Sequence, residues 1–157
     1  MCEIPVTIIL ASPRSGTTIL GEALGRHPEI TGWYEPYFIW DYLLPTLPDD
    51  VRTADMASPA VVDFVRGEFE TFRRKSGRPC VVEKTPRNAF KIEFIREIFP
   101  EARWIHLYRD GRDVVSSIQR EWRKRRQRSP GQRVGDVYRT LARQPFWRNR
   151  LQAIRYE

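Results

Sequence analysis

The stretch VTIILASPRSGTT, residues 6–18, decides how this chain of 157 residues folds. Its apolar first half predicts a buried strand, and the small residues that follow predict a tight turn. A helical pattern then begins, because Ile19, Leu20, Ala23 and Leu24 recur three and four residues apart. A strand that passes through a tight turn into a helix N-terminus makes an anion-binding site, since the first N–H groups of the helix have no partner within it.

The turn also carries side chains that suit a phosphate or sulfate group. Gly16 lets the backbone approach an anion closely, and Thr17 and Thr18 offer hydroxyl donors. Arg14 adds a planar fork of N–H donors that matches an oxyanion. The candidate anion-binding residues are therefore Arg14, Ser15, Gly16, Thr17 and Thr18.

This turn departs from the ordinary nucleotide-binding loop, Gly-x-x-x-x-Gly-Lys-Ser/Thr. Ala11 stands at the position of the first glycine, and Thr17 follows Gly16 where the lysine would be. The cation comes earlier, at Arg14. Residues 13–18, PRSGTT, instead resemble the loop that binds the 5'-phosphosulfate of 3'-phosphoadenosine 5'-phosphosulfate (PAPS) in sulfotransferases. On this loop alone, a polar turn with an exposed arginine remains the alternative.

A second segment strengthens the resemblance. Residues 104–108, WIHLY, predict another buried strand, and Asp110 behind it is a suitable N-cap for a helix. Arg109 and Ser117, eight residues apart with Asp113 between them, resemble the element that binds the 3'-phosphate in the same family. The resemblance implies that Arg109 and Ser117 hold the phosphate that distinguishes PAPS from ATP.

Two further segments match the family. Residues 83–86, Glu-Lys-Thr-Pro, resemble a segment of many bacterial and glycan-modifying sulfotransferases, which implies that Lys84 lies near the transferring sulfuryl group. For Glu83 we expect a charged strand end or an indirect role. The closing residues 154–157, IRYE, resemble the start of an Arg-Tyr-Glu-Asp-Leu strand, in which Tyr156 matches a position near the adenine. The resemblance implies that the whole chain is a single domain, incomplete at its C-terminus.

The resemblance also implies roles in catalysis. Arg14 and Lys84 would stabilise the charge that builds on the bridging oxygen of the leaving phosphate, in place of a metal ion. Glu35, in the segment GWYEP, is the candidate general base, because tyrosylprotein, glycan and trehalose sulfotransferases have a glutamate after the same helix. His106 lies inside a predicted strand and is expected to be structural, unlike the histidine base of the steroid and phenol branch.

The order of the elements predicts an α/β fold, a P-loop NTPase-like parallel sheet with helices on both faces. The aromatic and proline-bearing residues 33–48 are expected to form a loop and a substrate wall. The predicted strands lie at about residues 5–11, 80–83 and 103–108, and the predicted helices lie at about residues 17–25, from Pro59 to before Gly77, and around Phe90 to Phe99.

Composition narrows the possible partners. The net charge is +7, and six of the nine residues 120–128 are basic, for which we favour a solvated helix face over a surface for an acidic acceptor or nucleic acid. Cys2 and Cys80 lack metal-ligand spacing, so we expect no metal site, and Cys80 is expected to be a small core residue. No apolar run is long enough to span a bilayer, and a cytoplasmic location is expected.

We therefore expect a PAPS-dependent sulfotransferase that uses PAPS as co-substrate, needs no metal and sulfates a hydroxyl (or an amine) on an acceptor such as a glycan or a small metabolite. The sequence does not identify the acceptor, and sugars, lipids, small alcohols and protein tyrosines all stay open. The alternatives are a degenerate P-loop nucleotide kinase or NTPase, and an inactive nucleotide-binding fragment. The missing loop lysine and the lack of a clear magnesium-binding aspartate argue against the first alternative. No nucleic-acid partner is expected, and the sequence indicates no oligomeric state.

Overall fold

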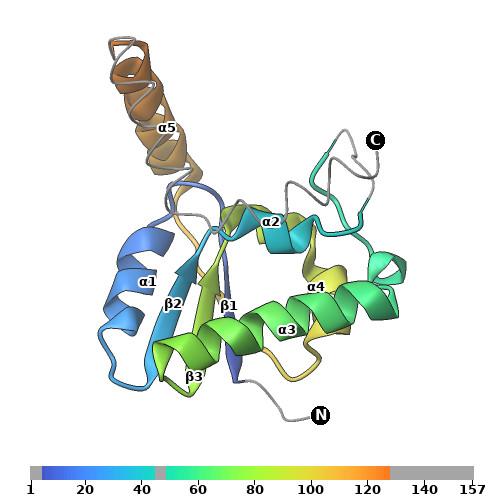
Figure 1. The fold of residues 1–157 in the computed structure, drawn as a ribbon. Coiled ribbons are helices and arrows are strands. Elements are labelled where there is room, and N and C mark those ends of the chain that lie inside the picture. The colour runs from blue at the N-terminus through green and yellow to red at the C-terminus, as the bar shows by residue number, and fades with distance from the viewer. Residues whose placement is uncertain (1–4, 45–48, 128–157) are drawn as a thin grey trace. The chain divides into compact units, whose positions relative to one another are not determined.

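The structure is a computed structural model that describes residues 5–44 and 49–127 (Figure 1). The chain divides into two compact units, Met1–Val114 and Val115–Glu157. The first unit holds a parallel sheet with its helices. Helix α5 (Gly111–Arg126) begins just before the boundary between the two units. The rest of this helix, together with Gln127, makes up the described part of the second unit.

Four parallel strands form the sheet, in the order β2-β3-β1-β4. They are β1 (Val6–Leu10), β2 (Ile30–Tyr34), β3 (Cys80–Lys84) and β4 (Arg103–His106). The predictions of β1, β3 and β4 are confirmed. The sequence does not predict β2, whose second half lies in the expected loop, because Thr31 and Gly32 interrupt any apolar run. Strand β2 lies at the edge of the described sheet and is only partly buried, so it can form without an apolar run.

Three helices connect consecutive strands. Helix α1 (Thr17–Gly25) follows β1, α3 (Pro59–Ser76) precedes β3, and α4 (Ile92–Ile98) precedes β4. Connections between parallel strands are right-handed, so α1, which leads toward the β2 edge, covers one face, while α3 and α4, which lead the opposite way, cover the other. Figure 1 shows α3 crossing in front of the sheet. The predicted α/β fold with helices on both faces is confirmed.

Short helical elements fill the remaining connections. They are α2 (Tyr37–Trp40), η1 (Ala54–Met56) and η2 (Pro86–Phe90). The prediction of a loop over residues 33–48 is wrong for α2, where Ile39 and Trp40 are fully buried in the core. Trp40, one of the aromatic residues expected to form a substrate wall, is therefore part of the hydrophobic core.

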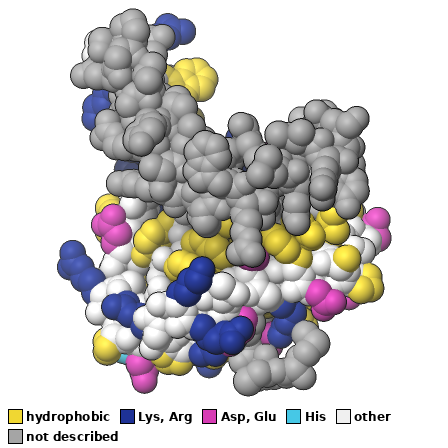
Figure 2. Space-filling view, in the orientation of Figure 1, with side chains coloured by type: hydrophobic (Ala, Val, Ile, Leu, Met, Phe, Trp, Pro, Cys, Tyr) yellow, Lys and Arg dark blue, Asp and Glu magenta, His cyan; other side chains and the backbone are white. Residues whose placement is uncertain are grey.

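Helix α3 forms as the sequence predicts. Pro59 occupies its first turn, where the missing N–H costs no hydrogen bond, and Gly77 ends it with a φ of 66°. Its buried residues recur every four positions, at Val61, Val65 and Phe69. These pack with β1, β3 and α4 in one hydrophobic core. On the face of the molecule that α3 covers, Figure 2 shows charged side chains of both signs.

Some predicted positions differ from the structure. Phe90 lies in η2 rather than in α4 and is 59% exposed, and Cys80, at the start of β3, is only half-buried. The strand predicted as buried around residues 104–108 ends at His106, and its residues are half-buried or exposed, because β4 is an edge of the described sheet. Tyr108, beyond its end, is 82% exposed.

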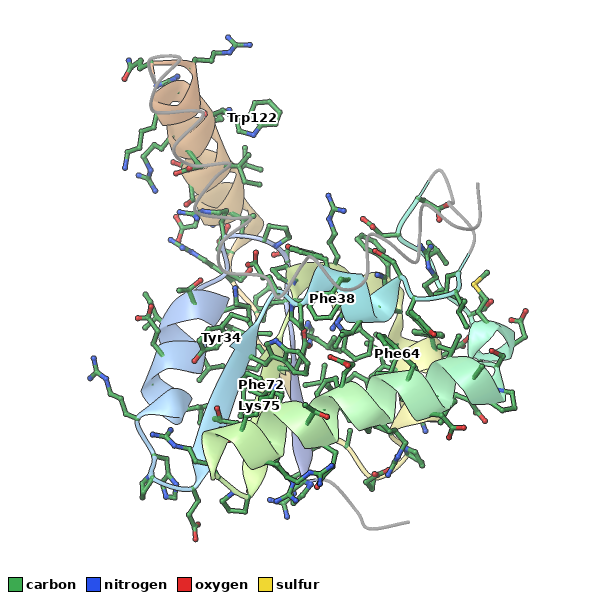
Figure 3. All side chains as sticks on the ribbon, viewed as in Figure 1. Tyr34, Phe38, Phe64, Phe72, Lys75 and Trp122 are labelled. Atoms are coloured by element: carbon green, nitrogen blue, oxygen red, sulfur yellow. The ribbon has the colours of Figure 1, made fainter. Side chains whose placement is uncertain are left out.

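The packed face of α1 also differs from the predicted apolar stripe. Ile19 is 75% exposed, whereas Thr17 and Gly21 are buried. Gly21 is covered by the ring of Tyr34, which lies between β2 and α1 (Figure 3) and whose hydroxyl donates to the carbonyl oxygen of Gly21 at 2.7 Å. A Cβ on Gly21 would lie 2.7 Å from Cε1 of Tyr34, and one on Gly32 would lie 2.1 Å from its Oη. Both glycines are needed for this close approach.

We expect Gly32→Ala to lower the free energy of unfolding by about 1–3 kcal/mol, the usual cost of over-packing, because the added methyl group would displace the ring of Tyr34. Urea denaturation measures this loss. In the double variant with Tyr34→Ala, the additional loss from Gly32→Ala should largely disappear, since no ring remains to be displaced. If the losses in unfolding free energy of Gly32→Ala and Tyr34→Ala simply add in the double variant, this explanation is wrong.

The matched control is Gly67→Ala in α3. Apart from its chain neighbours and the backbone of its own helix, no heavy atom of the described residues lies within 4 Å of a Cβ added there. Alanine in a helix interior is favoured over glycine by about 0.5–1 kcal/mol, so this variant should be more stable than the parent protein.

Candidate functional site

The predicted site residues follow the C-terminal ends of the strands, which meet at one edge of the sheet. Residues 12–16 follow β1, Glu35 follows β2, Lys84 ends β3 and Arg109 follows β4. In open parallel sheets, ligands bind outside this edge.

The loop after β1 has the backbone of an anion-binding turn. Gly16 and Arg14 have φ angles of 98° and 71°, in the left-handed region that arginine rarely adopts. Strain of this kind clusters at ligand-binding sites. No described side chain caps the start of α1, so the first N–H groups of that helix face the loop without a side-chain partner.

The loop side chains divide between its inside and its outside. Ser15 and Thr17 are buried, and the Ser15 hydroxyl lies 2.6 Å from that of Ser12. Arg14 and Thr18 are exposed. An incoming anion would therefore meet Arg14, Thr18 and the backbone N–H groups, while Ser15 and Thr17 shape the turn from within.

Arg109 lies beside this loop. Its Nη1 donates to the carbonyl oxygen of Arg14 at 3.1 Å, and its Nη2 is 3.7 Å from the carboxylate of Asp113. Asp110 caps α5 by accepting the N–H of Arg112 at 2.8 Å, as the sequence predicts, and the hydrogen bonds from Arg112 lower the pKa of Asp110. The two segments that resemble phosphate-binding elements are thus in contact.

The other two candidate nucleotide contacts are not placed at this edge. Ser117 lies on α5 in the second unit, and Tyr156 lies outside the described residues. The roles of Ser117 and Tyr156 stay predictions. The side chains described in the basic run of α5 are exposed at Arg120, Arg123, Lys124 and Arg126, as expected for a solvated helix face.

Glu35 and Lys84 form an ion pair at the ends of β2 and β3. Lys84 Nζ donates to Glu35 Oε1 at 2.6 Å, and the N–H of Glu35 donates to the carbonyl oxygen of Lys84 at 3.0 Å. The lysine side chain is 5% exposed and that of the glutamate 43%, so the carboxylate is the partner that solvent or a substrate can reach. Glu35 has a φ of 56°, a second strained residue at this edge. Tyr37 donates to its other oxygen, Oε2, at 3.2 Å.

Glu83 is fully buried on the opposite face from Lys84. Successive residues of a strand alternate in direction, and Glu83 pairs in register with Ile8 of the core while Lys84 pairs with Ile9. Its carboxylate accepts hydrogen bonds from Trp40 Nε1 at 3.3 Å, from Asn88 Nδ2 at 2.8 Å and from the Thr85 hydroxyl. Burial raises the pKa of Glu83 to about 7, against these hydrogen bonds. Sealed in this way, the carboxylate of Glu83 is out of contact with solvent.

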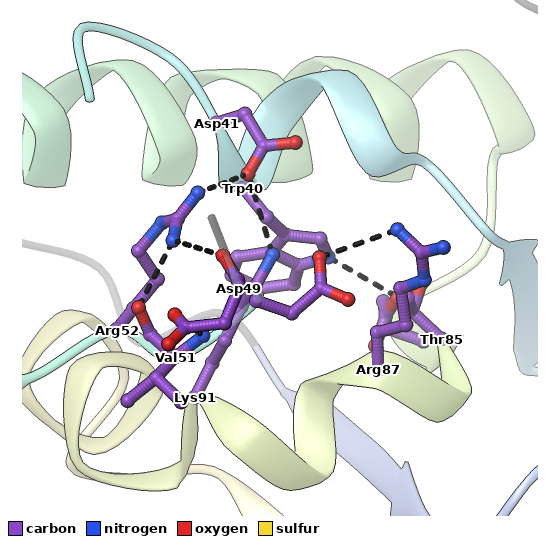
Figure 4. A network of polar contacts seen from close by, with 10 residues as sticks. Trp40, Asp41, Asp49, Val51, Arg52, Thr85, Arg87 and Lys91 are labelled. Atoms are coloured by element: carbon purple, nitrogen blue, oxygen red, sulfur yellow. Dashed lines mark hydrogen bonds and ion pairs between the residues drawn. The ribbon is translucent and has the colours of Figure 1, made fainter. Parts of the chain in front are cut away.

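Sequence reasoning missed a cluster of buried cations beside α2 (Figure 4). Lys91 and Arg52, 1% and 6% exposed, share one carboxylate oxygen of Asp41 at 3.4 and 3.3 Å. Burial lowers the pKa of Lys91, while Asp41 opposes the shift. One signal was present: Lys91, the residue just before α4, precedes Phe94, Ile95 and Ile98 at helical spacing, so it lies in line with the buried face of that helix.

The described residues include no group of His, Cys, Asp and Glu that could hold a metal ion. Among the helices that the structure describes, none combines the length and the apolar character needed to cross a membrane.

A family model described as "Sulfotransferase family" matches residues 5–157. Nodulation protein NoeE of Sinorhizobium fredii (strain NBRC 101917 / NGR234) is 25% identical over 132 residues, which cover 74% of this chain and 32% of that protein. Protein-tyrosine sulfotransferase of Drosophila melanogaster is 27% identical over 128 residues, which cover 74% of this chain and 25% of that protein. The chain thus spans a third or less of the length of these relatives.

The buried Glu83 predicts how stability changes with pH. Its pKa is about 7 in the folded protein and near 4.5 in an unfolded chain, so the folded state holds this proton more tightly. Stability should therefore fall as the pH rises from about 4.5 to about 7, with a limiting slope of about 1.4 kcal/mol per pH unit. Urea denaturation across this range should show a weaker dependence for Glu83→Gln than for the parent protein. Identical slopes would show that Glu83 does not carry this dependence.

Proposed function

Because the chain belongs to the sulfotransferase family, we propose that it transfers a sulfuryl group from PAPS to the hydroxyl of an acceptor. The observation that carries the proposal is the Glu35–Lys84 pair at the strand ends, one base and one cation in contact at 2.6 Å. The chain spans a third or less of the length of the relatives it matches, so the activity of a whole protein of that length is part of this proposal.

The nucleotide contacts follow from the two elements at the sheet edge. Residues 14–18 would hold the 5'-phosphosulfate, with Arg14 and the first N–H groups of α1 as donors. Arg109, which touches the carbonyl oxygen of Arg14, and Ser117 would hold the 3'-phosphate. Tyr156 would lie near the adenine.

The chemistry assigns a step to each charged group. Glu35 takes the proton of the acceptor hydroxyl, the acceptor oxygen forms a bond to sulfur, and the bond from sulfur to the bridging phosphate oxygen breaks. Adenosine 3',5'-bisphosphate leaves with the electron pair of that bond. Arg14 and Lys84 stabilise the charge that grows on the bridging oxygen. Once Glu35 has taken the proton and become neutral, the ammonium group of Lys84 interacts with the charge on the leaving group instead.

The acceptor is proposed to be a hydroxyl-bearing glycan or small metabolite. One relative is named a nodulation protein and another a protein-tyrosine sulfotransferase, so a tyrosine hydroxyl is a second acceptor to test. A kinase or NTPase is disfavoured, because Thr17 stands where such a loop carries its lysine. Sulfur-35-labelled PAPS offered with oligosaccharides, a tyrosine peptide and water distinguishes these acceptors, and ATP with magnesium tests the kinase alternative.

Removing the base should stop transfer but spare binding. We expect Glu35→Gln to lower turnover of labelled PAPS by about 10²–10⁴-fold, the contribution of a general base, with the affinity for adenosine 3',5'-bisphosphate nearly unchanged in calorimetry. Glu97→Gln makes the same chemical change on an exposed residue of α4 and is the control. Near-normal turnover of Glu35→Gln would show that Glu35 is not the base, and Glu83 could not replace it, because Glu83 is fully buried.

Arg109 should decide between nucleotides with and without a 3'-phosphate. We expect Arg109→Ala to lower the preference for adenosine 3',5'-bisphosphate over AMP by about 10–150-fold, because a hydrogen bond to a charged group contributes about 1.5–3 kcal/mol. Arg112→Ala is the control, since that side chain is 93% exposed and binds Asp110. Equal affinities of the parent protein for the two nucleotides would overturn the assignment.

A further inference from the structure

Tyr37, the first residue of α2, contacts the carboxylate that the proposed function uses as base. Its hydroxyl donates to Glu35 Oε2 at 3.2 Å, while Lys84 Nζ occupies Oε1 at 2.6 Å. Each oxygen of the carboxylate therefore has its own donor, one from α2 and one from β3. Two donors from separate elements hold a carboxylate against rotation about its last bond.

The backbone around Glu35 holds the same geometry. Its φ of 56° is left-handed, and its carbonyl oxygen accepts the N–H of Tyr37 at 2.9 Å. Such a conformation in a non-glycine residue persists only where neighbouring contacts require it. Main chain and side chain of Tyr37 thus both bind Glu35.

The ring of Tyr37 is itself held from outside. The guanidinium of Arg87 lies 5.7 Å from its centroid, and Arg87 forms an ion pair with Asp50 at 3.2 Å. A cation over the face of an aromatic ring is attracted to it. The contacts run from Asp50 through Arg87 and Tyr37 to Glu35, and they join the loop before η1 to the site.

We propose that Tyr37 is a positioning residue that holds the carboxylate of Glu35 where it receives the proton of the acceptor. This role rests on the proposed function. Burial and the neighbouring Glu35 raise the pKa of Tyr37 to about 12, so the phenol stays protonated and remains a donor at neutral pH. Tyr37 therefore does not compete with Glu35 for the acceptor's proton.

The test compares Tyr37→Phe, Glu35→Gln and the double variant. Phenylalanine keeps the ring and its contact with Arg87 and removes only the hydroxyl. The probe is the cleavage of labelled PAPS by water, in which Glu35 takes a proton of water as it would that of the acceptor. We expect Tyr37→Phe to lower kcat about 10-fold, with no change in the Kd of adenosine 3',5'-bisphosphate. In the Glu35→Gln background the same change should have no further effect, because it acts through Glu35.

The control is Tyr42→Phe, which removes a hydroxyl from a ring that stacks on Phe64 and should leave kcat unchanged. If Tyr37→Phe has normal kcat, or if its effect multiplies that of Glu35→Gln, the positioning role is wrong while the proposed function stands. If the parent protein cleaves no PAPS and transfers no sulfuryl group to any acceptor offered, the proposed function fails, and the positioning role with it.

Discussion

A buried ammonium group needs a negative partner, and the site of this protein depends on how that need is met for Lys84. With 5% of its side chain exposed, Lys84 ends a central strand of the sheet. Tyr34 stands opposite it in β2, so the next residue, Glu35, is the first that can fold over the strand end. The N–H of Glu35 extends the strand pairing by one hydrogen bond, and its carboxylate reaches the ammonium. A shift of the register by one residue would leave Lys84 buried without this partner.

The same short segment also serves the other face of the sheet. Glu83 and Lys84 point in opposite directions, and both are buried. The segment that begins with Glu35 beside Lys84 ends with Trp40, whose indole N–H binds Glu83. Helix α2 spans the distance between these two contacts. Residues 35–40, which follow β2, thus supply partners for both Glu83 and Lys84 of β3. These two contacts explain why the segment forms α2 instead of the expected loop.

Much of the fold could be predicted because its signals are local. The apolar run of β1, the turn at Gly16, and the proline and glycine that bound α3 each act within a few residues. Where the packing partner comes from elsewhere in the chain, prediction failed. Gly21 of α1 packs against Tyr34, which lies thirteen residues beyond it, and no helical periodicity records that contact. Strand β2 lies at the edge of the described sheet, where its residues are only partly buried, so its sequence shows no apolar pattern.

The sequence by itself determined the family and the α/β order of elements, because these depend on motifs and on the periods of strand and helix. It also predicted that residues 14–18 bind an anion. It also pointed to Lys84, Glu35 and Arg109 one at a time. Only the tertiary structure decided that Glu35 binds Lys84, that Tyr37 binds Glu35, and that Glu83 is sealed in the core. It also revealed the buried cations Arg52 and Lys91 around Asp41. The physical reason is that a charge is partnered or buried according to what lies next to it in space, and these partners are separated by up to fifty residues along the chain.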